Sequence, residues 1–422
     1  MLPKSYKGYT LIWRDTVDGY GGLLWTEIFI HKTGYFKIGY FVDEGVEMLS
    51  DGMFSVYWSP REFKIAGDRG LIFYKDKKNI DTMFKRFSVG KKRIQALEEH
   101  FHATQFSYCS NRELFALYEE LATTIKSYMD AYLYNEPQFI WRLEEMIRVH
   151  IAKHESNHKK QAETFSLLLY VPKNKRDKRE AEQRRILKDF KFSPKLTQFI
   201  LAIRRSGIER FSIKKYERKI STIRLPLLQE TARRTNLSLS QLNALHYEEL
   251  RDLLLKDKDP NLQEVNERAK NYFMYVRCKN KKLDVFLLSG EKAIRESQRL
   301  IAAVFGSSVN TLKGEVAYSG KVRGKARVFP FFALQKDLAK HMKTMEDKEI
   351  LVSVHTVPQM IPVALKASAI VTDEGGINGH AAIVSREFKI PCIIGVGNAT
   401  ERIKTGMEIE VDATNGVVTI ID

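Results

Sequence analysis

The chain has 422 residues, more than one compact core usually organises, so we expect two or three domains. Hydrophobic residues make up 44% of it and charged residues 29%, which provides enough apolar material for real cores and is ordinary for a soluble protein. No stretch approaches the roughly 18 consecutive apolar residues of a membrane span, and residues 1–8 lack the apolar run of a signal peptide, so we expect no membrane association.

The net charge of +17 belongs to one part of the chain. Residues 314–422 contain 13 basic and 13 acidic residues, whereas residues 1–313 contain 56 basic and 39 acidic residues. Such an excess can favour an anionic partner, for example nucleic acid, an acidic protein or a phosphorylated ligand. A solvated, lysine-rich surface explains it more simply, so nucleic-acid binding is possible but not favoured.

The three cysteines, Cys109, Cys278 and Cys392, lie far apart and share no metal-ligand spacing. We therefore expect reduced thiols, a cytoplasmic location and no metal site built from them. Cys392 stands within an apolar strand pattern, where a small buried side chain is expected rather than a reactive thiol.

Residues 1–77 are predicted to form a β-rich region. Short runs of aromatic and β-branched residues, separated by glycine and turn residues, are typical of antiparallel strands. The runs are residues 9–13, 24–30, 35–41 and 53–58.

Residues 78–306 are predicted to form a helical domain, because apolar residues recur there at helical spacing. The predicted helices cover 112–130, 139–170, 194–206, 209–234, 238–244, 246–256 and a segment that ends near 305. The charge run at 173–185 contains no aromatic residue that could stack on bases. Its alternating signs favour an exposed helix face or a loop over a nucleic-acid contact.

Residues 314–422 show a different pattern of strands, glycines and short helices, which follows a boundary at 306–313. Two strands are predicted around Gly320 and Gly324, and helices at 360–366 and 380–388. Further strands are predicted at 350–354, 369–372, 392–394, 408–411 and 416–420. This order describes a compact α/β domain.

The chemistry of this domain centres on His380. A predicted strand ends at Thr372, two glycines let the backbone turn, and His380 then stands at the start of an amphipathic helix. The free amides and the dipole of a helix N-terminus stabilise an anion. A neutral imidazole is nucleophilic near pH 7, so it can accept a phosphoryl group and pass it on. The alternative is a helix-capping histidine without chemistry.

Residues 314–422 resemble the phosphohistidine, or mobile swivelling, domain of the phosphoenolpyruvate-utilising enzymes: phosphoenolpyruvate synthase, pyruvate phosphate dikinase and rifampicin phosphotransferase. The matching segments are Ser319–Arg327, Thr356–Pro362, Thr372–Gly376, His380–Glu387, Ile390–Gly395 and Gly397–Thr400. The resemblance implies a swivelling β/β/α fold in which His380 is the phosphorylated residue. The expected fold class is therefore multidomain α+β: a β-rich N-terminal region, a central helical domain and this C-terminal domain.

The resemblance also assigns a phosphate-binding turn and helix start to Gly375, Gly376, Asn378, Gly379 and Ala381. The family usually has Thr followed by Ser or Cys directly before the histidine, where this chain has Asn378 and Gly379. Asn378 cannot be phosphorylated, as that Thr is in some relatives, but it can still cap a helix. Gly379 adds backbone freedom beside the nucleophile.

Four further residues are possible supporting residues of the site: Thr372, Asp373, Glu374 and Arg323. Arg323 could neutralise phosphate oxygens. Asp373 and Glu374 could orient the imidazole, and a purely structural role in the turn is equally consistent with their positions.

The helical region carries a weaker resemblance. Residues 226–250 resemble the stretch before the carrier domain in rifampicin phosphotransferase, where the helical region holds the phosphoryl acceptor. The sequence contains no P-loop and no GxGxxG motif followed by a helix, and its β-rich start is too short for an ATP-grasp fold. A carrier of this family therefore implies an ATP-grasp donor protein in trans. ATP and Mg²⁺ would then lie on that partner, with no cofactor tightly bound here.

The sequence thus predicts a phosphotransferase component that carries a phosphoryl group on His380 from a separate ATP-grasp or phosphoenolpyruvate-dependent donor to an unidentified acceptor, such as a small molecule. The alternative is a basic adaptor for an anionic partner, nucleic acid or an acidic protein, in which the carrier-like domain is not catalytic.

Overall fold

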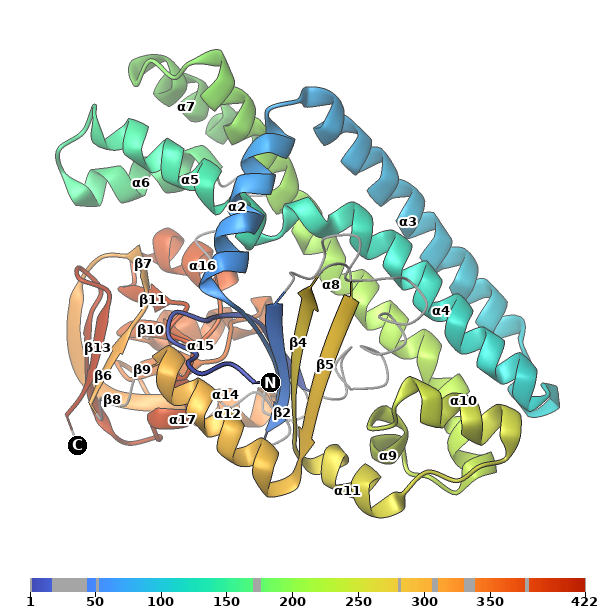
Figure 1. Ribbon diagram of the computed structural model, residues 1–422. Coiled ribbons are helices and arrows are strands. Elements are labelled where there is room, and N and C mark those ends of the chain that lie inside the picture. Colours follow the sequence, from blue (N-terminus) through green and yellow to red (C-terminus); the bar gives the residue numbers. More distant parts are fainter. Residues whose placement is uncertain are drawn as a thin grey trace. The chain divides into compact units, whose positions relative to one another are not determined.

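The computed structural model of the chain describes residues 2–16, 44–50, 53–169, 176–279, 282–305, 310–329, 338–375 and 379–421. Helices and strands are both abundant in it (Figure 1). The chain divides into two compact units. The first unit comprises Met1–Leu143 and Ile208–Val304, and the second comprises Glu144–Gly207 and Phe305–Asp422. The strands predicted at 24–30 and 35–41 lie outside the described residues.

The first unit contains an antiparallel sheet with the strand order β1-β3-β2-β4-β5. Its strands are β1 (Thr10–Thr16), β2 (Glu44–Ser50), β3 (Met53–Trp58), β4 (Tyr272–Lys279) and β5 (Lys282–Ser289). β1 and β3 confirm the strands predicted at 9–13 and 53–58. The β4–β5 hairpin corrects the prediction of a helical domain over 78–306, because β4 pairs with β2 from the N-terminal part of the chain and β5 pairs with β4.

Helix α2 (Pro60–Tyr74) is a second difference, because it occupies a range predicted to be β-rich. Ser59 caps the helix by accepting the Glu62 backbone N–H, and Pro60 fits the first helical position. The range 1–77 was predicted to be β-rich as a whole, but Ser59 and Pro60 set the start of a helix. Ala66 of α2 packs with the inner face of the sheet in one hydrophobic cluster.

Several of the remaining helices of the first unit contribute to a second hydrophobic cluster. They include α3 (Lys77–Ala103), η2 (Phe106–Tyr108), α4 (Asn111–Tyr132), α9 (Leu239–Asn243), α10 (Tyr247–Lys256) and α11 (Leu262–Lys270). The unit also contains η3 (Leu133–Asn135) and α12 (Gly290–Phe305). Helix α5 (Pro137–Ala152) begins in this unit, and α8 (Pro194–Thr235) ends in it. Sequence reasoning divided α8 into two helices; it is continuous, with Pro226 inside it.

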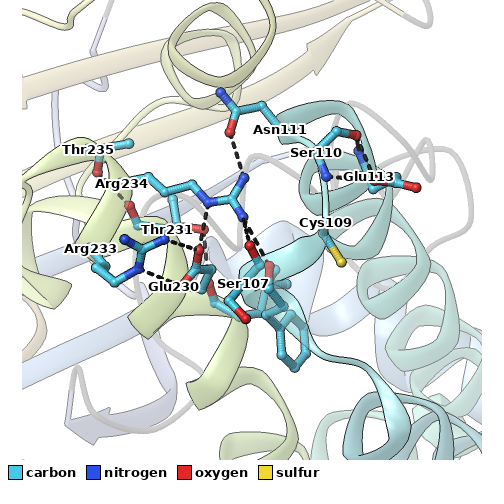
Figure 2. A network of polar contacts seen from close by, with 12 residues as sticks. Ser107, Cys109, Ser110, Asn111, Glu113, Glu230, Thr231, Arg233, Arg234 and Thr235 are labelled. Atoms are coloured by element: carbon cyan, nitrogen blue, oxygen red, sulfur yellow. Dashed lines mark hydrogen bonds and ion pairs between the residues drawn. The ribbon is translucent and has the colours of Figure 1, made fainter.

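Arg234 connects the end of α8 to the start of α4 (Figure 2). Its guanidinium donates to Glu230 at 2.7 Å, to Asn111 Oδ1 at 3.0 Å and to the Phe106 carbonyl at 3.0 Å. Arg233 binds both oxygens of Glu230, at 2.7 and 2.9 Å. These bonds, first to Arg233 and then to Arg234, lower the pKa of Glu230 to about 2. One buried carboxylate thus anchors two arginines at a helix junction.

The second unit contains α6 (His158–Leu169), α7 (Arg176–Asp189) and the C-terminal α/β domain. The domain has an eight-stranded sheet with the order β6-β13-β12-β8-β9-β10-β11-β7. Its strands are β6 (Thr311–Lys313), β7 (Glu315–Tyr318), β8 (Lys321–Phe329), β9 (Ile350–Ser353), β10 (Ala369–Thr372), β11 (Cys392–Ile394), β12 (Glu408–Asp412) and β13 (Val417–Ile420). Its helices are α14 (Leu338–Met342), η5 (Pro358–Met360), α15 (Ile361–Lys366), α16 (His380–Phe388) and α17 (Ala399–Arg402).

Two hydrophobic clusters make this domain three-layered. β8 pairs with β12 through its first half and with β9 through its second half, so it belongs to both parts of the sheet. Alternate residues of the central strands point to opposite faces. Ile350, Val352 and Val371 join one cluster with β12 and β13. Leu351 and Ile370 join the other cluster, with α15 and α16. This arrangement is the β/β/α layering predicted for residues 314–422.

The Glu230 junction yields the first prediction. Replacing Glu230 by Gln should lower the free energy of unfolding at pH 7 by about 1–2 kcal/mol, because hydrogen bonds to a charged group are lost. The pKa of Glu230 is depressed, so its contribution is present above its unfolded value of 4.5 and is lost as the pH falls towards 2. Urea denaturation between pH 7 and 2 should therefore show a shallower acid loss in the variant.

The matched control is Glu291→Gln, which removes a carboxylate that is 86% exposed and paired with Arg295 on α12. It should change the stability by less than about 0.5 kcal/mol. Equal losses in the two variants would contradict the assigned role of Glu230.

Candidate phosphohistidine site

The candidate site lies where three parallel strands end. β9, β10 and β11 are parallel neighbours, so their carboxyl ends meet at the same edge of the sheet. Ligands of open α/β sheets bind outside such edges. The segment after β9 carries Thr356, the segment after β10 leads to His380, and the segment after β11 leads into α17. Residues far apart in the sequence are thereby gathered at one edge.

His380 is the first residue of α16, as the sequence predicted. Gly379 occupies the N-cap position in an extended conformation and provides no side-chain cap, and its carbonyl accepts the Ile383 N–H at 3.0 Å. The first-turn amides of a helix have no acceptor within the helix, so those of His380 and Ala381 are suited to an anion. The side chain of Ala381, in the first turn of α16, is buried. Gly376 and Asn378 lie outside the described residues, and their predicted roles stay predictions.

Thr356 fixes the orientation of the His380 ring. Its Oγ1 lies 2.8 Å from His380 Nδ1, and Thr356 itself is buried. The His380 ring is half-buried, and burial lowers the pKa of His380 below its ordinary value of 6.5. The ring is therefore neutral at pH 7. When Nδ1–H donates to the Thr356 hydroxyl, the lone pair is on Nε2, which is then the nucleophilic nitrogen.

Thr356 lies in one of the segments that resemble the family, but it is not among the site residues predicted from the sequence. The order of the strands could have indicated it. Thr356 follows a buried strand that neighbours the strand before His380, and parallel neighbours end at the same edge.

Asp373 has a structural role near His380. It is buried, and its carboxylate accepts the Thr400 N–H at 3.2 and 3.3 Å and the Thr400 hydroxyl proton. The Gly397 N–H donates to the Asp373 carbonyl at 2.9 Å. Asp373 therefore holds the segments after β10 and β11 together, which supports the turn interpretation of this residue.

The other possible supporting residues lie in different surroundings. Glu374 Oε2 is 3.8 Å from His355 Nδ1. Thr372 is fully buried at the end of β10. Gly375 follows with a φ of +129°, a value that favours glycine. Arg323 lies on β8, where it donates to Glu408 of β12 at 2.7 Å. This pair connects neighbouring strands, and a phosphate-clamping role for Arg323 stays a prediction.

Among the residues that the structure describes, no group of three or more His, Cys, Asp or Glu side chains is placed to hold a metal ion. None of the helices described there has the length and apolar character to cross a membrane. Cys109 and Cys392 are free thiols, and burial raises the pKa of Cys392 to about 12.

The family model described as the mobile domain of PEP-utilising enzymes matches residues 345–416, which include His380. The C-terminal segment is therefore similar to this mobile domain. It is 52% identical over 80 residues to a probable phosphoenolpyruvate synthase of Staphylothermus marinus, and 50% identical over 80 residues to the phosphoenolpyruvate synthase of Pyrococcus furiosus. Each match covers 19% of this chain and 10% of the relative.

A third relative has a different kind of name. Chondramide synthase of Chondromyces crocatus is 44% identical over 102 residues, which are 24% of this chain and 2% of that protein. The chain thus spans a tenth or less of the length of these three curated relatives. The similarity is confined to the mobile domain.

The surroundings of His380 yield the second prediction. The midpoint of its titration should lie below that of the same residue in the urea-unfolded chain, because burial disfavours the imidazolium ion. Long-range ¹H–¹⁵N NMR spectra recorded from pH 4 to 8 would follow both ring nitrogens and report the tautomer. A midpoint at or above that of the unfolded chain would contradict the half-buried placement of the ring.

Proposed function

We propose that this chain is a phosphotransferase component that carries a phosphoryl group on Nε2 of His380 between a donor and an acceptor. The observation that carries the proposal is the hydrogen bond between Thr356 Oγ1 and His380 Nδ1. It occupies one ring nitrogen and leaves the other for chemistry, and among the described residues Nε2 has no hydrogen-bond partner. The mobile-domain match and the relatives named phosphoenolpyruvate synthase support the same reaction class.

The proposed transfer step requires little from the protein beyond positioning. The Nε2 lone pair attacks the phosphorus atom, the Nε2–P bond forms, and the P–O bond to the donor breaks with its electron pair leaving on the donor oxygen. The Nδ1 proton remains shared with Thr356, which accepts from the ring as positive charge develops. The N-terminus of α16 favours the negative charge of the transferred group. Transfer to the acceptor reverses these changes.

The donor and acceptor are part of the proposal. An ATP-grasp protein acting in trans, with ATP and Mg²⁺ bound to it, would load His380. The acceptor would be a small molecule, for which the helical region is the candidate binding region. A cytoplasmic location and the division into regions 1–77, 78–306 and 314–422 belong to the same proposal.

Small-molecule phosphorylation tests the carrier without its partner. The full-length protein is incubated with phosphoramidate, whose P–N bond breaks as ammonia leaves and the Nε2–P bond forms. Intact-mass measurement and fragmentation should locate one phosphoryl group on His380, stable to base and labile to acid. His380→Asn should lack it, because a side-chain amide does not form a stable phosphoramidate under these conditions.

The outcome separates the two functions under consideration. No phosphoryl group on His380 of the folded protein, or equal labelling of the other histidines, would contradict the carrier proposal and favour the basic adaptor. Once labelling is established, ATP with an ATP-grasp protein and phosphoenolpyruvate alone can be compared as natural donors. Labelling by neither would place the donor in another class.

A further inference from the structure

In the part of the chain that the structure describes, the Thr372 hydroxyl has no hydrogen-bond partner, although Thr372 is fully buried. Native proteins pair nearly all such groups, because an unpaired buried hydroxyl loses its hydrogen bonds to water without replacement. Only the side-chain hydroxyl of Thr372 is unpaired, because its backbone carbonyl accepts the Val396 N–H at 3.0 Å. A valine would fit the same volume without this cost. The position therefore carries a polar group that the folded chain by itself does not use.

Asn398 presents the same feature after the neighbouring strand. It is buried, it occupies the N-cap position of α17, and its Oδ1 has no partner. An asparagine at this position normally accepts a helix amide. Here Asp373 accepts the Thr400 N–H instead, and Asn398 makes no side-chain cap. The unpaired Oδ1 is an acceptor, and a half-turn of the side-chain amide about Cβ–Cγ would put its NH₂ donors in the same place.

The Thr372 hydroxyl and the Asn398 side chain lie at the edge of the sheet where the segment leading to His380 begins. Thr372 shares a face of β10 with Ile370, and this face packs beneath α15 and α16. Its hydroxyl is 3.7 Å from the point where a Cβ of Gly375 would stand, so it lies directly under the glycine turn that leads to His380. Asn398 follows the Gly397 amide, which is bonded to Asp373. The two unpaired groups thus come from adjoining segments.

We propose that the Thr372 hydroxyl and the Asn398 side-chain amide bind the oxygens of the phosphoryl group carried on His380. Nδ1 faces Thr356 after β9, so Nε2 is on the side of the ring away from Thr356. Thr372 is the last residue of β10 and Asn398 follows β11, the next strands along the edge. A hydroxyl donates one hydrogen bond and an amide NH₂ donates two. This inference rests on the proposed function and adds the residues that hold the transferred group.

The test is Thr372→Val in the full-length protein, with phosphoramidate as the probe. The rate of phosphohistidine formation should fall about ten- to hundred-fold, as expected for one lost hydrogen bond to a charged group. The midpoint of thermal unfolding should stay the same or rise, because an unpaired buried hydroxyl is removed. A purely structural role would not lower the labelling rate while leaving the stability intact.

Thr400→Val is the matched control for stability. It removes a hydroxyl that has a partner, Asp373, and should lower the unfolding midpoint. Asn398→Asp is the second variant, because a carboxylate near the phosphoryl group should slow labelling by repulsion and shorten the lifetime of the phosphohistidine.

The results distinguish this inference from the proposed function. If wild-type His380 is labelled and both Thr372→Val and Asn398→Asp are labelled at the wild-type rate, the inference is wrong and the carrier function stands; the unpaired groups then bind water only. If wild-type His380 is not labelled, both are wrong.

Discussion

The hydrogen bond between Thr356 and His380 depends on a constraint that no local segment supplies: β9 and β10 must be parallel neighbours that end together. Thr356 is the third residue after the end of β9, and His380 is the eighth residue after the end of β10. Only the pairing of the two strands brings these side chains to hydrogen-bond distance. The orientation of the imidazole is therefore a property of the sheet.

The same edge is stiffened by groups that do not react. Asp373 joins the segment after β10 to α17, while Ile370 and Ile394 pack beneath the helix that carries His380. Burial under this packing lowers the pKa of His380 and keeps the ring neutral. The domain thus combines a rigid sheet edge with a glycine turn, at Gly375, that only a residue without a side chain adopts easily.

Much of the C-terminal domain could be predicted from the sequence. Fully buried strands of three or four residues, such as Ile350–Ser353, stand out as short apolar runs in the sequence, and the helix of His380 begins at the predicted residue. The contact of Thr356 with His380 could not be predicted from periodicity, because it spans 24 residues and depends on strand order. The unpaired state of Thr372 and Asn398 is also invisible in the sequence, since it reflects which partners are missing after folding.

Two predictions for the first 306 residues were wrong, and one of them failed because strand pairing depends on distant parts of the chain. The hairpin at Tyr272–Ser289 was predicted as part of a helical region because helices surround it in the sequence. Its partner strand, β2, lies more than 200 residues earlier, so tertiary pairing overrides the local context. Helix α2 lies within the range 1–77 that was predicted to be β-rich as a whole, although Ser59 and Pro60 are local signals of a helix start.

The identity of the phosphorylated nitrogen tests the central claim most directly. A ¹⁵N-labelled protein loaded with phosphoramidate would be studied by NMR for the one-bond coupling between ³¹P and the ring nitrogens of His380. The account predicts coupling to Nε2, with Nδ1 protonated and facing Thr356. Coupling to Nδ1 would contradict it, because Thr356 would then have to release the nitrogen that it holds in the folded domain.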